Sequence, residues 1–197
     1  MAMQYRLENL YVDQDPEYVI DCMAAVLAWV PGRGKGRWTQ PYVFNVLHEP
    51  APAQAPMPIA LELSWDLDVL KQKDPGISNC ADRMRRGKTV LHEDVAKLAA
   101  YGLAFVAISA IHPGLKVVRM NSYAAPDLIY DDTPGAIRGV EVAGRSSGGQ
   151  YVLKKVRLGD KTTTGKQQQL LGRTDVAEAH LSLWCVYPRV ALIAKVK

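Results

Sequence analysis

The stretch RGVEVAGRSSGG (Arg138–Gly149) decides how the second half of this chain folds. Its first half is apolar and predicts a short strand, and its second half is a glycine and serine turn that ends the strand. One carboxylate, Glu141, interrupts the apolar run. Because successive side chains of a strand point to opposite faces, Glu141 points away from the two valines beside it. That face is therefore either solvated or holds the acid against a basic partner such as Arg138 or Arg145.

The residues before this strand predict a meander that follows a buried helix. Three short apolar segments occur at tight spacing, over 115–121, 127–130 and 137–143. The helix is predicted over 92–111, because this segment begins with two acids, which suit a helix N-terminus, and then becomes apolar on all sides. Pro113 and Gly114 end it.

The remaining elements complete an α/β (α+β) pattern. Apolar alternation predicts strands over 4–12, 42–47, 59–67, 180–186 and 190–196, and an extension of the meander over 150–156. Helical spacing predicts helices over 16–30 and 162–175, the second opened by threonines. Residues 71–88 are interpreted as a polar excursion.

Length and composition are typical of one folded domain. With 197 residues, of which 48% are hydrophobic and 22% charged, the chain is long enough for one well-buried core and short for two. We therefore expect a single domain over 1–197. Cys22, Cys80 and Cys185 are far apart and odd in number, which matches neither a disulfide framework nor metal-ligand spacing.

The compartment follows from the cysteines and from the apolar segments. Unpaired cysteines indicate a reducing cytoplasm. The N-terminus carries acids and no apolar core, so it does not resemble a signal peptide. The longest apolar run, 98–111, is too short to cross a bilayer. We expect a cytoplasmic protein with no membrane partner.

Positive charge is concentrated after the Glu141 strand. The net charge is +4, but residues 143–173 hold seven basic side chains against one acid, Asp160. Basic residues gathered in this way hold a nucleic-acid backbone with little sequence information. A solvated surface is the alternative. Further basic candidates are Arg33, Lys35 and Arg37 with Trp38, and Arg83, Arg85, Arg86 and Lys88.

Two acids form the candidate chemical site. Asp127 follows a proline at the start of a strand, and a hairpin would bring it beside Glu141 at one sheet edge. Such a pair suits a divalent metal, since magnesium takes one or two protein carboxylates and leaves other positions to water and substrate phosphate. The alternative for Asp127 is a turn cap after Pro126.

A helix, a strand, the dipeptide Pro126-Asp127 and an acid inside the next strand together resemble the PD-(D/E)XK nuclease superfamily. The resemblance covers roughly Leu91–Val186. It implies a mixed central β-sheet flanked by helices, with a restriction-endonuclease-like core over 91–197 and an N-terminal elaboration over 1–90. It also implies that Asp127 and Glu141 bind the catalytic Mg²⁺ or Mn²⁺. Some members add an acid from the preceding helix, which here would be Glu93, with Asp94 as substitute.

The sequence departs from this family at the usual catalytic lysine. The tripeptide is Glu141-Val142-Ala143, so alanine stands where the lysine is expected. Some members supply the lysine from the helix after the strand, and this chain offers Lys166 in the segment GKQQQLL, with Gln169 on the same face. Asp127, Glu141 and Lys166 are therefore the catalytic candidates.

The resemblance implies a metal-dependent nuclease that hydrolyses phosphodiester bonds of nucleic acid. The nucleic-acid-binding candidates are Arg145, Lys154, Lys155, Arg157, Lys161 and Arg173. The alternative, supported by Ala143, is an inactive nuclease-fold module that binds nucleic acid or a protein partner, or forms a homo-oligomer, within a larger assembly such as a bacterial defence complex. Trp38, Tyr42, Trp65 and Tyr187 would suit an interface of that kind.

Overall fold

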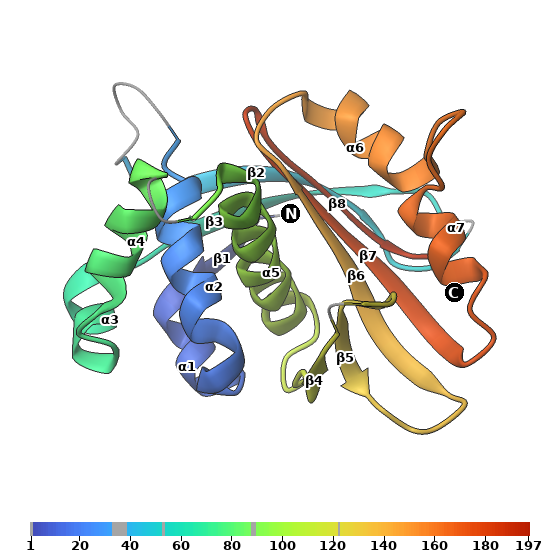
Figure 1. Cartoon of the computed structure of the whole chain (residues 1–197), viewed down its shortest axis with the longest axis horizontal. Coiled ribbons are helices and arrows are strands. Elements are labelled where there is room, and N and C mark those ends of the chain that lie inside the picture. Colours follow the sequence, from blue (N-terminus) through green and yellow to red (C-terminus); the bar gives the residue numbers. More distant parts are fainter. Residues whose placement is uncertain (1, 33–38, 53, 88–89, 122) are drawn as a thin grey trace. The chain divides into compact units, whose positions relative to one another are not determined.

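A computed structural model describes residues 2–32, 39–52, 54–87, 90–121 and 123–197 of the chain. Within these residues it is an α+β structure with a mixed, eight-stranded sheet flanked by helices, in the order β1-β3-β2-β8-β7-β6-β5-β4 (Figure 1). This confirms the expected α/β class with a mixed sheet. The strands are β1 (Ala2–Arg6), β2 (Tyr42–Glu49), β3 (Met57–Ser64), β4 (Arg119–Met120), β5 (Leu128–Asp131), β6 (Ile137–Arg145), β7 (Val176–Val186) and β8 (Arg189–Lys195).

The helices account for most of the remaining chain. They are α1 (Leu10–Asp13), which follows a 3-10 turn (Leu7–Asn9), then α2 (Pro16–Trp29), α3 (Leu67–Lys73), α4 (Ile77–Arg86), α5 (His92–Ile111), α6 (Gly149–Leu158) and α7 (Lys166–Leu171). The chain divides into two compact units. One consists of Met1–Phe44 with Ala60–Leu115, and the other of Asn45–Ile59 with Lys116–Lys197. The single-domain organisation stays a prediction.

The first unit is built around helices α2 and α5, which pack along each other (Figure 1). Helix α2 begins where the Asp15 carboxylate accepts a hydrogen bond from the Glu17 N–H at 2.9 Å, with Pro16 at the first helical position. The two helices approach closely at Gly102, where an added Cβ would lie 2.6 Å from Cγ2 of Val26. A glycine is needed at this contact.

Helix α5 is the most apolar element of the chain. Its length and composition would allow it to cross a membrane, but 72% of its most apolar stretch is buried inside the structure. That is how the core helix of a compact unit behaves. The described chain therefore has no evident membrane-spanning character, while its cytoplasmic location stays a prediction.

The second unit carries the meander. Strands β4, β5 and β6 are antiparallel neighbours, β6 and β7 are parallel, and β7 and β8 are antiparallel. Helices α6 and α7 cover one face of this sheet, where Leu153 and Leu170 pack into a cluster with Leu181 and Leu183 (Figure 1). Because Glu141 is paired with Leu181 in the register of β6 and β7, Glu141 belongs to the same helix-covered face.

The strand predicted over 150–156 is wrong, since these residues belong to α6. The turn before α6 ends at Gly148 and Gly149, whose positive φ angles of 104° and 60° redirect the chain. Leu153 and Val156 then face the sheet at helical spacing. The apolar residues of this segment therefore follow the 3.6-residue period of a helix and not the two-residue alternation of a strand.

Three other segments differ from expectation. Residues 7–12, predicted as the second half of a strand over 4–12, form the 3-10 turn and most of α1 instead. Residues 71–88 contain the end of α3 and all of α4 rather than an irregular excursion. The helix predicted over 162–175 is restricted to α7. Thr162 and Thr163 do not open it, because their backbone N–H groups and hydroxyls bond to the Asp160 carboxylate in the turn that precedes it.

Candidate active site

The β5–β6 pairing brings the two candidate acids together. Leu128 is paired with Val140, and continuing this antiparallel register by one residue puts Asp127 opposite Glu141. The Val142 N–H donates a hydrogen bond of 2.8 Å to Oδ2 of Asp127. Asp127 is thus tied to the strand that carries Glu141, which is what a shared site requires.

A glycine on β6 lets the Pro126-Asp127 segment approach. An added Cβ at Gly139 would lie 2.6 Å from Cγ of Pro126 and 2.5 Å from the backbone oxygen of Leu128. Any larger residue would push the two strands apart. Gly139 precedes Glu141 by two residues and Pro126 precedes Asp127 by one, so this contact fixes the offset at which the acids meet.

Glu141 is a buried carboxylate with one neutralised oxygen and one unsatisfied oxygen. Its side chain is 2% exposed, and Oε1 forms an ion pair with the Lys166 ammonium group. Oε2 is buried and accepts no hydrogen bond from any residue that the structure describes. Burial raises the pKa of this carboxyl well above its usual range, and the neighbouring Asp127 charge raises it further, while Lys166 opposes both effects.

Glu141 therefore pairs with Lys166 and with neither of the two arginines, Arg138 and Arg145, that the sequence suggested. Arg138 lies 3.7 Å from Asp131 in an exposed ion pair, and Arg145 donates to the carbonyl of its neighbour Gly144. The charge within the strand is thus explained by an ion pair between the buried Glu141 and a half-exposed lysine of α7.

Lys166 is delivered by the tight junction between α6 and α7. An added Cβ at Gly165 would lie 2.2 Å from the carbonyl carbon of Leu158, so only glycine allows α7 to begin against the end of α6. The Lys166 side chain is 32% exposed, which leaves its ammonium group in contact with both Glu141 and solvent. Gln169 is bonded elsewhere, donating to the Thr164 carbonyl at 3.2 Å.

The arrangement fits a hard divalent cation. Asp127 and Glu141 supply carboxylate oxygens, and the unsatisfied Oε2 of Glu141 is the buried polar atom that a bound cation would satisfy. Among the described residues, no cluster of three or more His, Cys, Asp or Glu side chains is formed. Two carboxylates are the number that Mg²⁺ usually takes from a protein. Glu93 is exposed in the first turn of α5, in the other unit, and its role as a ligand stays a prediction.

The basic candidates fall into two groups. Arg145, Lys154, Lys155 and Lys161 are exposed and form no ion pair within the described part of the chain. Arg157 is neutralised by Glu49, with two hydrogen bonds of 2.8 Å. Arg173 is held by Asp175 and by the Ala125 carbonyl. The first group is better placed to meet an outside anion.

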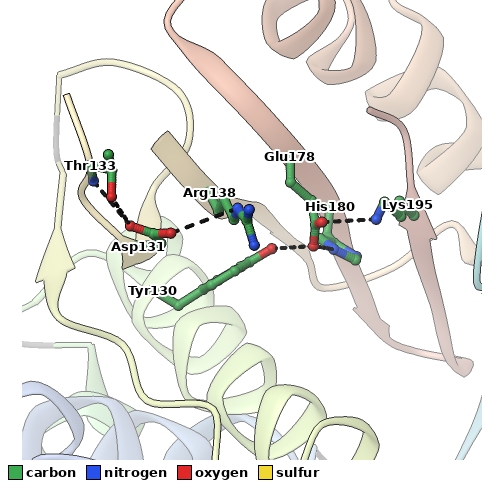
Figure 2. Close-up of polar contacts among 7 residues, drawn as sticks. All are labelled: Tyr130, Asp131, Thr133, Arg138, Glu178, His180 and Lys195. Carbon is green, nitrogen blue, oxygen red and sulfur yellow. Dashed lines mark hydrogen bonds and ion pairs between the residues drawn. The ribbon is translucent and has the colours of Figure 1, made fainter. Parts of the chain in front are cut away.

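A second polar cluster, which the sequence analysis missed, surrounds Glu178 (Figure 2). Glu178 accepts from the Tyr130 hydroxyl at 2.7 Å, contacts Nε2 of His180 at 3.0 Å and pairs with the Lys195 ammonium group at 2.9 Å. His180 is paired with Val140, which places it on the face away from Glu141. Glu178 and His180 are two positions apart in β7, so they point to the same face of the strand, and this spacing is the sequence signal that could have revealed the cluster.

Glu178 is the common hydrogen-bond acceptor of this cluster. Burial opposes its ionisation, but the bonds from His180, Tyr130 and Lys195 outweigh burial and lower its pKa to about 2. Burial together with Glu178 raises the pKa of Tyr130. Because donors and the acceptor already satisfy one another, the cluster stabilises the sheet rather than forming a second reactive centre.

The aromatic interface candidates and the remaining basic residues named from the sequence lie in different environments. Tyr42 is buried and stacks on Trp65 with ring centroids 4.8 Å apart, so it belongs to the core, whereas Tyr187 is exposed. The basic loop Arg33, Lys35 and Arg37 with Trp38, and also Lys88, lie outside the described residues.

Comparison with known proteins adds no identification. The chain matches no protein-family model, no curated protein and no solved structure.

Proposed function

We propose that this protein is a metal-dependent nuclease that hydrolyses phosphodiester bonds of nucleic acid. The observation that supports it is the convergence of Asp127, Glu141 and Lys166 in the second unit, with one buried oxygen of Glu141 left unsatisfied. The order of elements supports it as well, since a helix, the meander and a lysine-bearing helix follow one another as the superfamily resemblance implies.

Each residue has a defined task. Asp127 and Glu141 would hold Mg²⁺ or Mn²⁺, which when bound lowers the pKa of water and stabilises negative charge at phosphorus. Lys166, already bonded to Glu141, orients the attacking water beside that carboxylate. The water oxygen forms a new bond to phosphorus and one ester P–O bond breaks, which leaves a phosphate monoester and a free hydroxyl.

The missing lysine at position 143 is compatible with this assignment. Ala143 is half-buried and packs against the core cluster under α6 and α7. A lysine there is not needed to bring an ammonium group to Glu141, because α7 supplies one. The basic residues Arg145, Lys154, Lys155 and Lys161 belong to the same unit as the acids.

The test is cleavage of labelled single-stranded and duplex DNA and RNA with Mg²⁺, Mn²⁺ or a chelator. We expect cleavage that needs metal and is lost in Asp127→Asn and in Glu141→Gln, while the matched variants Asp132→Asn and Glu17→Gln keep full activity. Cleavage that survives in both site variants would contradict the proposal. Nucleic-acid binding without cleavage by the wild type would favour the inactive module instead.

A further inference from the structure

The outer face of α6 carries an exposed aromatic ring among lysines. Tyr151 is 68% exposed and Leu158 is 57% exposed. Lys154 and Lys155 are exposed three and four residues after Tyr151, so all four side chains share one helix face. Single exposed apolar side chains are common on protein surfaces, so the feature that indicates a binding role is the exposed ring together with the lysines beside it.

One face of the Tyr151 ring is covered by a cation. The Lys155 ammonium group lies over the ring, 4.9 Å from the centroid, so the opposite ring face is the one left for a stacked base. Two further exposed cations, Lys154 on α6 and Lys161 just after it, form no ion pair among the described residues. The nearest acid in the sequence is Asp160, whose carboxylate accepts hydrogen bonds from the hydroxyls of Thr162 and Thr163. The face therefore combines a flat π surface with unneutralised positive charge.

The C-terminal end of this face lies beside the start of α7, the helix that carries Lys166. Helix α6 ends against Gly165, the residue before Lys166, and Arg157 donates to Gln167 of α7 at 2.6 Å. From Tyr151 to Leu158 the helix rises only about 10 Å, which is roughly the span of two or three nucleotides. A row of lysines binds the phosphates of a single strand, and an exposed ring stacks on one of its bases, which are not held in base pairs.

We infer that the α6 face formed by Tyr151, Lys154, Lys155 and Leu158 binds single-stranded nucleic acid, with one base stacked on the Tyr151 ring. The inference deepens the proposed nuclease function by naming the substrate class. A duplex keeps its bases paired and stacked inside, so it can meet the lysines but cannot use the ring.

The experiment measures binding by fluorescence anisotropy, without metal, in an Asp127→Asn background that cannot cleave. The probes are labelled dT20, labelled rU20 and a 20-base-pair DNA duplex. Tyr151→Ala should weaken binding of the single strands about tenfold, as expected for loss of one stacked base, and change duplex binding less than twofold. Tyr151→Phe should restore the affinity because it keeps the ring.

Two matched variants locate the effect. Tyr123→Ala removes an exposed tyrosine between β4 and β5, outside α6, and should leave all affinities unchanged. Lys154→Gln with Lys155→Gln should weaken every probe and reduce the salt dependence, whereas Lys71→Gln, on α3, should not. Preference for dT20 or for rU20 would identify the strand as DNA or RNA, and either preference agrees with the inference.

Three results would overturn it. They are unchanged single-strand affinity in Tyr151→Ala, an equal loss of duplex affinity in that variant, or no binding of either single strand at low salt. Failure of the nuclease assignment is distinguishable, because single-strand binding that depends on Tyr151 in a protein without metal-dependent cleavage would support a binding module that uses the same face. Circular dichroism of each variant checks that the exposed substitutions leave the fold intact.

Discussion

The Lys166 ammonium group forms an ion pair with Oε1 of Glu141, although the two residues are 25 positions apart in the chain. The pair joins α7 to β6, across the helix-covered face of the sheet. It places a cation beside a carboxylate that has a second, unsatisfied oxygen. The relationship has consequences for activity and for stability, which separate measurements can test.

Removing the lysine should reduce cleavage strongly. Lys166→Met takes away the group that orients the attacking water, and we expect a loss of at least about 100-fold in kcat with little change in KM. Lys71→Met, on the surface of α3, is the matched control and should cleave normally. Steady-state cleavage of a labelled oligonucleotide measures both parameters. An unchanged kcat in Lys166→Met would exclude a role for the ammonium group in the reaction.

The same substitution should destabilise the fold in a pH-dependent way. Without Lys166, ionised Glu141 is buried with no counter-charge, which we expect to cost about 2 kcal/mol at pH 8. At pH 5 the carboxyl can be protonated, and the cost should be smaller. Urea unfolding of both proteins at the two pH values gives the difference. Equal destabilisation at both values would mean that charge is not the cause.

Glu141 should limit stability at neutral and alkaline pH. Its folded pKa is raised from 4.5 to about 7, so the folded state binds an extra proton between those values and stability falls as the pH rises through the folded pKa. Glu141→Gln cannot ionise and should be more stable than the wild type by about 2 kcal/mol at pH 8, with little advantage at pH 5. Chemical denaturation of both proteins between pH 5 and pH 8, without metal, measures how the difference in unfolding free energy changes with pH. A wild type that gains stability relative to the variant as pH rises would reverse the predicted sign.

The Glu178 cluster predicts the opposite dependence on pH. Because its pKa is lowered from 4.5 to about 2, this carboxylate stabilises the fold above its unfolded value and the contribution is lost as pH falls towards 2. Glu178→Gln should cost about 1 kcal/mol at pH 7, less than about half of that at pH 3, and almost nothing only below about pH 2. Metal-dependent cleavage should stay within twofold of the wild type, because the cluster lies on the other face of the sheet. A large loss of activity in a folded variant would give the cluster a role in the reaction.

Packing of Gly139 against Pro126 should control the site through the strand offset. Gly139→Ala would force a Cβ within 2.6 Å of Pro126, and we expect a cost of about 2 kcal/mol together with reduced activity. Gly172→Ala is the matched control, since its φ of −71° suits alanine and the nearest contact of a Cβ there is 3.4 Å. Thermal unfolding and cleavage rates of the two variants make the comparison. Similar behaviour of both variants would show that the Pro126 contact is not critical.

Helix α5 of the first unit and much of the second unit followed from local patterns. Helix α5 begins and ends at the expected residues, and the hairpin that pairs β5 with β6 follows from two short apolar segments separated by a turn. Adjacent strands then put Asp127 and Glu141 side by side, because the antiparallel register leaves few alternatives. This part of the site could be predicted from chain order alone.

The rest depends on contacts between residues far apart in sequence. That Lys166, rather than Arg138 or Arg145, meets Glu141 follows from the fit of Gly165 against the end of α6, which no short pattern encodes. The neutralisation of Arg157 by Glu49 joins residues 108 positions apart. Residues 150–156 were misinterpreted because valine and tyrosine suit strands, while packing against the sheet selected the helix.

The central claim is that one divalent cation is held jointly by Asp127 and Glu141. Binding of Mn²⁺, followed by electron paramagnetic resonance of the free ion, tests it most directly. We predict one saturable site per chain in the wild type, also present in Asp132→Asn, and lost in both Asp127→Asn and Glu141→Gln. Mn²⁺ binding by either of these two variants with the affinity of the wild type would contradict the claim.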